Sequence, residues 1–310
     1  MNRKKLCLIG SSYFTVFVYD NLVKFFDINQ ISTIHPKMYG RHENEIKDNP
    51  FAHHLKAKGV TNILYSLDEI DWNGSDIYLV ASYSKIIKSR FIQNSNHPMI
   101  NFHVSLLPDL RGAIPVQMAI YKGYEYIGTS IIKITDGLDE GDILIQNKFE
   151  LNKEYNTEDV FKQSAEMLSL GLYNSMDNYF NDIFIKQDGN VSYAKLKDLE
   201  IIRGEQPDLK HIYRSYLALS PYDTLHLELL GRELELVSVK LLDINEFNQT
   251  LINLKEINLN KSYSLFFNKN HVYLLEKDFV IELLEVKPIG KRNLSPIEYI
   301  NGYIKTEKHI

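Results

Sequence analysis

Asn101 and His103 stand two residues apart at the start of the stretch 101–112, where apolar and polar residues alternate. Successive side chains of a strand point to opposite faces, so a strand here places the amide and the imidazole on one face. Their Cα atoms then lie roughly 6.6 Å apart, which lets both side chains reach one small substrate group. An amide N–H suits a developing oxyanion, and an imidazole can take a proton from an attacking amine near neutral pH. The pair is therefore suited to acyl transfer.

An imidazole works best as a base when a carboxylate fixes its tautomer. The segment after Ile134 offers Asp136, Asp139 and Asp142, and its glycines allow a close turn into a cleft. The residues alone leave two interpretations open, an amide–imidazole–carboxylate site or a hydrogen-bonded structural pair followed by an ordinary loop. The sequence contains no serine or thiol nucleophile elbow and no metal-ligand spacing, which disfavours covalent catalysis and a metal hydrolase.

These residues must be positioned by the elements around them. Strands that alternate with helices predict an α/β domain with a largely parallel sheet over residues 1–195. The run 77–81 is continuously apolar, as in a strand covered on both faces, and Ser12 is suited to cap a helix. We predict strands over 5–10, 31–34, 62–67, 76–82, 100–104, 127–134 and 143–149, and helices over 13–26, 45–58, 86–93, 114–121 and 157–180.

The character of the chain changes after residue 195. A polar linker is expected over 196–206 and a small β-rich domain over 207–310. Short β runs at near-regular spacing predict a small β-barrel or sandwich. In this part we predict a helix over 209–217, strands over 225–229, 234–237, 263–267, 272–275 and 280–286, and a hairpin turn at 231–232.

Composition and charge limit the classes of function. The 310 residues carry a net charge of −5, and residues 205–310 hold 13 Lys or Arg against 15 Asp or Glu, a net charge of −2. Neither value indicates binding of nucleic acid or of an anionic membrane. No apolar run approaches the roughly 18 residues of a membrane span. The single Cys7 excludes an internal disulfide and fits a reducing cytoplasm, which is the location we expect.

Several motifs in a fixed order point to a family. N-x-H at 101–103, S-L-L-P at 105–108, R-G at 111–112 and D-x-G-D at 139–142 together resemble the folate-dependent formyltransferases. Residues 220–222 and 290–295 are similar to the C-terminal barrel of the methionyl-tRNA formyltransferase type. The resemblance implies a Rossmann-like catalytic domain followed by a small, OB-like β-barrel.

The resemblance also implies the chemistry of the site. N10-formyltetrahydrofolate would be the formyl donor, and no metal is implied. His103 would take the amine proton, Asn101 would stabilise the oxyanion, and Asp139 would orient His103 and raise its basicity. Ser11 and Arg111 are candidates for contact with the second substrate, Arg111 through a phosphate. The folate would lie near Lys85, Ile86, Ile87, Ser105, Leu106, Leu107, Thr135, Asp136, Gly137 and Leu138.

The amine acceptor is the open question. A nucleotide-linked amino sugar, with dTDP as the expected nucleotide, is favoured over methionyl-tRNA because the chain is net acidic. The chain also departs from the tRNA enzymes near its start. It has Gly-Ser-Ser-Tyr-Phe at residues 10–14, where those enzymes carry a G-T-P-x-F-like turn. Glycinamide ribonucleotide is disfavoured because enzymes of that type end after the α/β domain. A sugar enzyme of this kind would act in O-antigen or lipopolysaccharide biosynthesis.

One alternative belongs to another class of protein. A formyltransferase-like domain could bind folate or a sugar nucleotide without turnover, as a sensor. The complete set of Asn101, His103 and Asp139 argues against that interpretation. A homodimer formed through exposed strands is compatible with the sequence.

Overall fold

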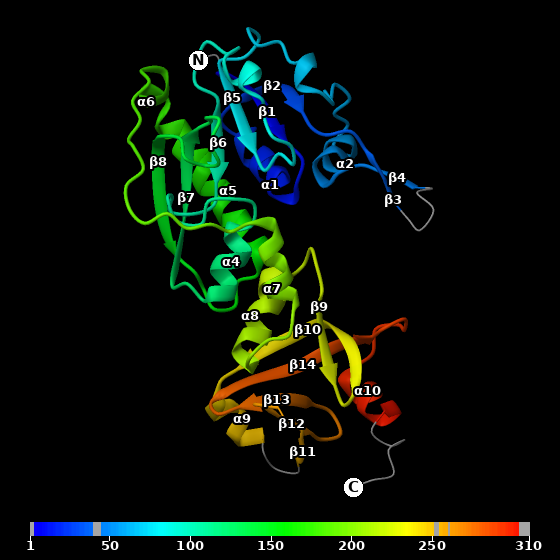
Figure 1. Cartoon of the computed structure of the whole chain (residues 1–310). Coiled ribbons are helices and arrows are strands. Elements are labelled where there is room, and N and C mark those ends of the chain that lie inside the picture. Colours follow the sequence, from blue (N-terminus) through cyan, green and yellow to red (C-terminus); the bar gives the residue numbers. More distant parts are fainter. Residues whose placement is uncertain (1–2, 40–44, 251–253, 260, 304–310) are drawn as a thin grey trace. The chain divides into compact units, whose positions relative to one another are not determined.

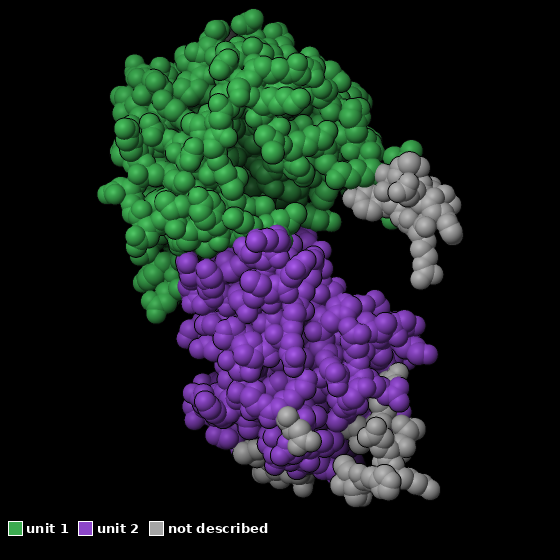
Figure 2. Space-filling view, viewed as in Figure 1, with its two compact units in different colours: residues 1–116, 125–151, 158–196 green, residues 117–124, 152–157, 197–310 purple. Residues whose placement is uncertain are grey.

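The computed structural model describes residues 3–39, 45–250, 254–259 and 261–303. Two compact units divide the chain, and Figure 2 colours them separately. Unit 1 comprises residues 1–116, 125–151 and 158–196, and unit 2 comprises residues 117–124, 152–157 and 197–310. The domain limits expected from the sequence stay a prediction, and their outer ends at residues 1–2 and 304–310 lie outside the described residues.

The α/β part of the chain follows the predicted alternation of strands and helices (Figure 1). Its elements are β1 Lys5–Gly10, α1 Tyr13–Leu22, β2 Asp27–Ser32, β3 Lys37–Tyr39, β4 Glu45–Lys47, α2 Pro50–Ala57, the 3₁₀-helix η1 Leu67–Glu69, β5 Ile77–Ala81, α3 Ser89–Ile92, β6 Ile100–His103, α4 Pro115–Lys122, β7 Tyr126–Lys133, β8 Ile143–Glu150, α5 Thr157–Asn174, α6 Met176–Phe180 and the 3₁₀-helix η2 Leu196–Asp198.

The main sheet has the strand order β2-β1-β5-β6-β7-β8. Strands β2, β1, β5 and β6 are parallel to one another, whereas β7 pairs antiparallel with both β6 and β8. The sheet is thus Rossmann-like but mixed, because β7 runs opposite to β6 and β8. Because β7 is antiparallel to β6, its last residues lie beside the start of β6. Ile134 N–H, just after β7, donates to Met99 C=O over 2.8 Å. The segment that follows therefore begins next to β6.

An apolar core covers the face of the sheet that also carries the two predicted site residues. Val80 of β5 pairs with Ile9 of β1 on one side and with Asn101 of β6 on the other. Residues paired across neighbouring strands share a face, so Asn101 and His103 continue the row of Ile9 and Val80. Ile9 and Val80 pack in one buried cluster with Cys7, Tyr78, Phe91 and Met99. The polar pair thus stands at the end of an otherwise apolar face.

Several predicted elements have different limits in the structure. The helix expected over 13–26 ends at Leu22, because the chain turns to begin β2 at Asp27, whose N–H donates to Lys4 C=O over 3.0 Å. The strand expected over 31–34 is shifted to Asp27–Ser32, since Asn29 and Gln30 hydrogen-bond the turn 71–75 and make a polar strand possible. The prediction of a strand over 62–67 was wrong except for an isolated bridge at Leu64.

Three predicted helices also differ. The helix expected over 45–58 is replaced by strand β4 and the shorter α2, in which Pro50 takes the first position after the Asn49 cap. The helix expected over 86–93 is only α3, because residues 86–88 have no regular structure and Lys88 is extended. The long helix over 157–180 is divided at Ser175, whose torsion angles of φ −106° and ψ 17° are not helical.

The C-terminal part is a separate, mainly antiparallel β structure. Its elements are α7 Leu199–Arg203, α8 Leu209–Leu219, β9 Leu225–Leu229, β10 Arg232–Leu242, α9 Ile244–Thr250, β11 Lys255–Asn258, β12 Ser264–Phe267, β13 Val272–Glu276, β14 Phe279–Pro288 and α10 Pro296–Tyr303. The strand order is β11-β12-β13-β14-β10-β9, and register shifts near Ser238 allow the long β10 to bend. The sheet forms half of a small barrel (Figure 1).

The sequence predicted most of this second sheet but missed some elements. The hairpin turn lies one residue earlier than predicted, at Leu230 and Gly231, which both have positive φ angles, and Arg232 already belongs to β10. Helices α9 and α10 and strand β11 were not predicted, and the expected linker over 196–206 contains η2 and α7. Within the described ranges, no helix combines the length and apolarity needed to cross a membrane.

The thiol of Cys7 gives a test of this core. Cys7 is fully buried in β1, and burial raises the pKa of its thiol to about 12. The thiolate is the reactive form, so the protonated and inaccessible Cys7 should resist iodoacetamide in the native protein at pH 8. Mass spectrometry should show alkylation only after unfolding in guanidinium chloride. Rapid alkylation of the native protein would contradict the packing of β1.

Candidate active site

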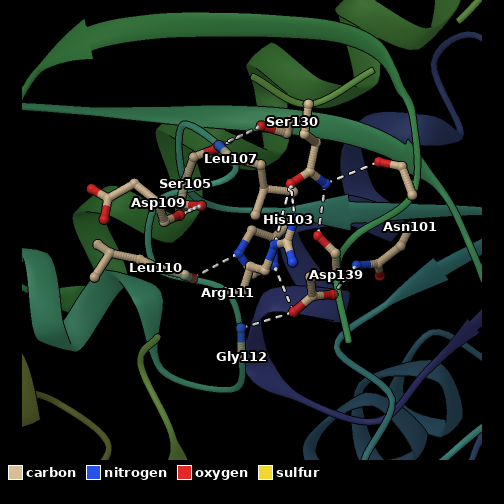
Figure 3. A network of polar contacts seen from close by, with 12 residues as sticks. Asn101, His103, Ser105, Leu107, Asp109, Leu110, Arg111, Gly112, Ser130 and Asp139 are labelled. Atoms are coloured by element: carbon tan, nitrogen blue, oxygen red, sulfur yellow. Dashed lines mark hydrogen bonds and ion pairs between the residues drawn. The ribbon is translucent and has the colours of Figure 1, made fainter. Parts of the chain in front are cut away.

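Asn101, His103 and Asp139 lie together on the face of β6 (Figure 3). His103 Nδ1 is 3.7 Å from Asp139 Oδ2, and Asn101 Nδ2 donates to Asp139 Oδ1 over 3.5 Å. The His103 side chain is only 6% exposed and that of Asp139 15%. The loop after β7 thus brings a carboxylate to the two polar side chains of the strand.

The other ring nitrogen of His103 identifies the tautomer. His103 Nε2 lies 3.0 Å from the carbonyl oxygen of Leu110. A carbonyl oxygen only accepts, so Nε2 carries a hydrogen and donates it. In a neutral ring with Nε2–H, Nδ1 is the nitrogen that can accept a proton, and it lies 3.7 Å from Asp139 Oδ2, beyond hydrogen-bond distance. When Nδ1 takes up a proton, the ring becomes a cation directly beside an anion.

The Asp139 carboxylate has a second partner in the backbone. Gly112 N–H donates to Asp139 Oδ2 over 2.8 Å. Asp139 itself has φ +51°, and Leu110, which supplies the carbonyl for His103, has φ +56°. Left-handed backbone is uncommon for residues other than glycine, and such residues often occur at functional sites. Leu110 O and Gly112 N–H were not assigned to the site from the sequence, because a motif does not show where backbone groups point.

The turn after β6 is held by hydroxyl and amide groups. Ser105 Oγ donates to Asp109 C=O over 2.6 Å, so its hydroxyl is used within the turn. Ser130 Oγ donates to Ser105 C=O over 2.7 Å, and Gln146 Nε2 donates to Leu107 C=O over 3.0 Å. Leu107 is buried at 3% exposure. These bonds fix the turn that leads from His103 to Leu110.

The side chain of Leu106 packs against strand β7. It fills the space above Gly128 of β7, where an added Cβ would lie 2.2 Å from Leu106 Cδ2. The side chain of Leu106 thus packs on the sheet. Ser105, Leu106 and Leu107 shape the turn beside His103, and their expected contact with folate stays a prediction.

The other residues predicted to contact folate lie on two neighbouring loops. Ile86 is 93% exposed and Leu138 55% exposed, whereas Ile87 packs against the buried core cluster. Ser89 Oγ donates to Asp136 Oδ1 over 2.5 Å, which ties the start of α3 to the loop after β7. The side chains of Lys85 and Thr135 are exposed, and Gly137 lies against the Glu140 side chain. Exposed apolar side chains beside buried polar groups fit a ligand that joins an aromatic ring to a polar carbonyl.

The two candidate substrate contacts are engaged within the protein. Ser11 Oγ donates to Ser82 C=O over 3.3 Å and lies 2.7 Å from Ser84 Oγ, so it joins the β1–α1 turn to the loop after β5. The Arg111 guanidinium is 3.7 Å from Glu140 Oε2, and it also donates to Gln187 Oε1. Neither side chain is directed only to solvent. The described residues contain no group of three His, Cys, Asp or Glu that could hold a metal ion.

Comparison with known proteins decides the family. A family model described as formyl transferase matches residues 20–174, half of the chain. The chain belongs to the formyl transferase family. It is 30% identical to the methionyl-tRNA formyltransferase of Caldicellulosiruptor saccharolyticus over 74% of this chain and 71% of that enzyme. The Ureaplasma parvum enzyme of the same name is 25% identical over 97% of this chain and 98% of its own.

Solved structures share the fold of this formyl transferase. The N-formyltransferase of Helicobacter canadensis, in complex with folinic acid and dTDP-3-aminofucose, has a TM-score of 0.61 and 16% identity, covering 93% of this chain and 100% of that one. HypX of Aquifex aeolicus in complex with tetrahydrofolic acid has a TM-score of 0.65 and 14% identity. The match covers 98% of this chain but 48% of HypX. Members of the family are folate-dependent one-carbon transferases, so the chain is an enzyme of this class.

Gly112 offers a test of the Asp139 contact. Gly112 has φ +119°, and an added Cβ would lie 2.6 Å from Ala194 C=O, so Gly112→Ala must shift the N–H that binds Asp139. We expect a loss of about 1–3 kcal/mol in the free energy of unfolding, together with a large loss of turnover. Urea unfolding measures the free energy of unfolding, and a formyl-transfer assay measures turnover.

Gly59 provides the matched control. It also has positive φ, at +78°, but no heavy atom lies within 4 Å of its added Cβ. Gly59→Ala should therefore cost backbone strain while leaving turnover unchanged. Equal loss of turnover in both variants would show that the Gly112 N–H has no special role.

Proposed function

We propose that the enzyme moves the formyl group of N10-formyltetrahydrofolate to the primary amine of a nucleotide-linked amino sugar. The pair of a buried His103 and a half-buried Asp139, with Asn101 on the same strand face, is the observation that carries the catalytic part. In this proposal the amine attacks the formyl carbon directly, and the bond between that carbon and N10 of the folate breaks. The proton that His103 takes from the amine passes to N10 of the leaving tetrahydrofolate. A serine or thiol nucleophile is not needed, and the catalytic residues supply a base and an oxyanion donor.

His103 acts as the base through Nδ1. Nε2–H is already committed to Leu110 C=O, which holds the ring and leaves Nδ1 as the nitrogen that accepts the amine proton. The proton then lies between His103 and Asp139, where the carboxylate balances the new charge in a site with little water. General-base catalysis of this kind contributes about 10²–10⁴-fold in rate.

Asn101 acts as the oxyanion donor. Its amide is neutral at every accessible pH and carries two N–H groups. One of them points to Asp139 Oδ1 over a long 3.5 Å, and the other is left to donate to the formyl oxygen as negative charge develops on it. Removing one such donor typically costs about 10²–10³-fold in rate.

The loops around the catalytic residues would hold the folate. When bound, N10-formyltetrahydrofolate supplies an activated formyl group. Ile86 and Leu138 offer exposed apolar surface for its ring, and Ser89 and Asp136 tie the start of α3 to the loop after β7. Lys85, beside Ile86, has an exposed side chain that can contact a ligand carboxylate.

Substitution of the catalytic residues tests their roles. His103→Asn and Asp139→Asn keep side chains of related shape but remove the base and the carboxylate charge. We expect turnover to fall by about 10²–10⁴-fold in each, while circular dichroism and folate binding stay close to those of the wild type. Near-wild-type turnover in either variant would remove that residue from the mechanism.

Charge favours a small acceptor over an RNA. The chain carries a net charge of −5, and salt bridges neutralise several cations of unit 2, including Arg203 with Asp223 and Arg292 with Glu298. Enzymes that bind polyanions need a basic path along which phosphates can lie. The fold shared with the Helicobacter canadensis enzyme over 93% of this chain supports the same choice, since that protein was solved with dTDP-3-aminofucose.

Methionyl-tRNA is the second candidate acceptor. The observation that favours it is the sequence match to the Ureaplasma parvum methionyl-tRNA formyltransferase, which extends over 97% of this chain and includes the C-terminal part. The two candidates differ in size and charge. They therefore predict different dependence of binding on salt.

An acceptor assay separates these candidates. The enzyme is incubated with N10-formyltetrahydrofolate and either a panel of dTDP-amino sugars or charged initiator tRNA. We expect the mass of one formyl group to be added to a sugar and no saturable gel shift with the tRNA at physiological salt. Formylation of the tRNA without any sugar product would reverse the assignment. Binding of folate without turnover of either acceptor would favour a sensor.

A further inference from the structure

Gln187 is fully hydrogen-bonded between Arg111 and the loop of Asp139. Its Oε1 accepts from Arg111 Nε over 3.2 Å and from Arg111 Nη2 over 2.7 Å. Its Nε2 donates to Asp139 C=O over 2.7 Å and to Gly141 C=O over 2.9 Å. A guanidinium only donates and a carbonyl only accepts, so the amide has one possible orientation. All of its donors and acceptors are used.

We propose that Arg111 and Gln187 act as one positioning unit, the Arg111–Gln187 bridge, which holds the backbone of the Asp139 loop against His103. The proposal rests on the proposed function, because there Asp139 supports the base. Neither residue of the bridge reaches the His103 ring by a hydrogen bond. Both act through Asp139 and are therefore positioning residues.

The backbone on both sides of Gln187 is pinned to the rest of unit 1. Ile185 and Ile143 exchange two backbone hydrogen bonds, of 2.7 and 2.8 Å. Farther along, Arg111 N–H donates to Ser192 C=O over 2.9 Å, and Ala194 N–H donates to Arg111 C=O over 2.8 Å. The segment 183–195 is thus held at β8 and at the turn that carries Arg111. Gln187 lies between these two anchors.

The Asp139 loop needs such support because its own backbone is unfavourable. Asp139 has positive φ, and a buried or half-buried carbonyl without a donor costs free energy. Gln187 supplies donors to two carbonyls of this loop, those of Asp139 and Gly141. Without them the loop can relax, and the carboxylate can move away from His103.

The environment of Arg111 agrees with this role. Arg111 is 9% exposed, and its guanidinium makes two bonds to Gln187 and a longer contact to Glu140. A side chain that is buried and paired in this way is a poor receptor for a mobile phosphate. The bridge therefore gives Arg111 a different role from the phosphate contact expected from the sequence.

The substitution Gln187→Glu separates the two halves of the bridge. The carboxylate still accepts from Arg111, but it cannot donate to Asp139 C=O and Gly141 C=O and instead repels them. We expect kcat to fall by about 10²-fold, the cost typical of a misplaced catalytic group, while the KM values of both substrates change little. A loss confined to KM would overturn the proposal.

Gln30 supplies the matched control. Its Nε2 also donates to a backbone carbonyl, that of Asp71, over 2.9 Å, and its Oε1 accepts from Asp71 N–H. Gln30→Glu therefore makes the same chemical change in the same unit without touching the Asp139 loop. We expect it to lower the melting temperature without changing kcat. An equal fall of kcat in both variants would reduce the effect of Gln187→Glu to general loss of stability.

A double-mutant cycle tests whether the bridge acts as a unit. Gln187→Met, Arg111→Met and the double variant are compared by kcat. If one unit is broken in each case, the double variant should be no slower than the slower single variant. Additive losses would mean independent roles and would overturn the proposal. So would an Arg111→Met variant with an unchanged kcat and a raised KM for the acceptor, because Arg111 would then contact substrate.

A crystal structure of Gln187→Glu keeps this inference separate from the choice of acceptor. The proposal expects the Asp139 carboxylate to lie farther from His103 Nδ1 than the 3.7 Å of the native chain. An unmoved carboxylate would overturn the bridge even if the wild-type enzyme proved active on a sugar. A displaced carboxylate would support it even if the acceptor proved to be a tRNA.

Discussion

The site depends on a carboxylate held against an imidazole where water has little access. Charges removed from water lose hydration, and only well-placed partners restore that loss. Asp139 has such a partner in Gly112 N–H, and His103 has one in Leu110 C=O. Residues 110 and 112 thus each bind one member of the pair, and the side chain of Arg111 between them reaches the backbone of Asp139 through Gln187. One short turn therefore contacts both members of the pair directly and the Asp139 backbone through Gln187.

The mixed direction of the sheet explains how the carboxylate reaches this turn. If β7 were parallel to β6, its following loop would leave from the edge where β6 ends. Because β7 is antiparallel, the loop begins beside Met99, at the start of β6, and crosses the face that carries Asn101 and His103. The departure from a fully parallel sheet is thus part of the construction of the site.

The sequence reveals the strand-borne half of the site better than the loop-borne half. Alternation in β6 places Asn101 and His103 on one face, and the structure agrees. Asp139 could be chosen among three nearby aspartates only through the family motif. Gln187 carries no pattern at all, because its importance comes from a tertiary contact with residues 46 and 48 positions away. Helix α3 covers only Ser89–Ile92 of the predicted stretch 86–93, and periodicity did not show that Ile87 would pack inward while Ile86 stays exposed.

Two polar side chains of the site are buried, whereas one apolar side chain on a neighbouring loop is almost fully exposed. His103 and Arg111 are buried, at 5% and 9% exposure, while Ile86 is 93% exposed on a neighbouring loop. Hydrophobic burial alone would favour the opposite arrangement. The buried polar groups are tolerated because each has a hydrogen-bond partner in the turn or on Gln187. The exposed apolar side chain has no such compensation within the described part of unit 1, and contact with a bound ring would remove it from water. Folding thus leaves an apolar side chain in water beside the buried polar groups, as the proposed folate contact requires.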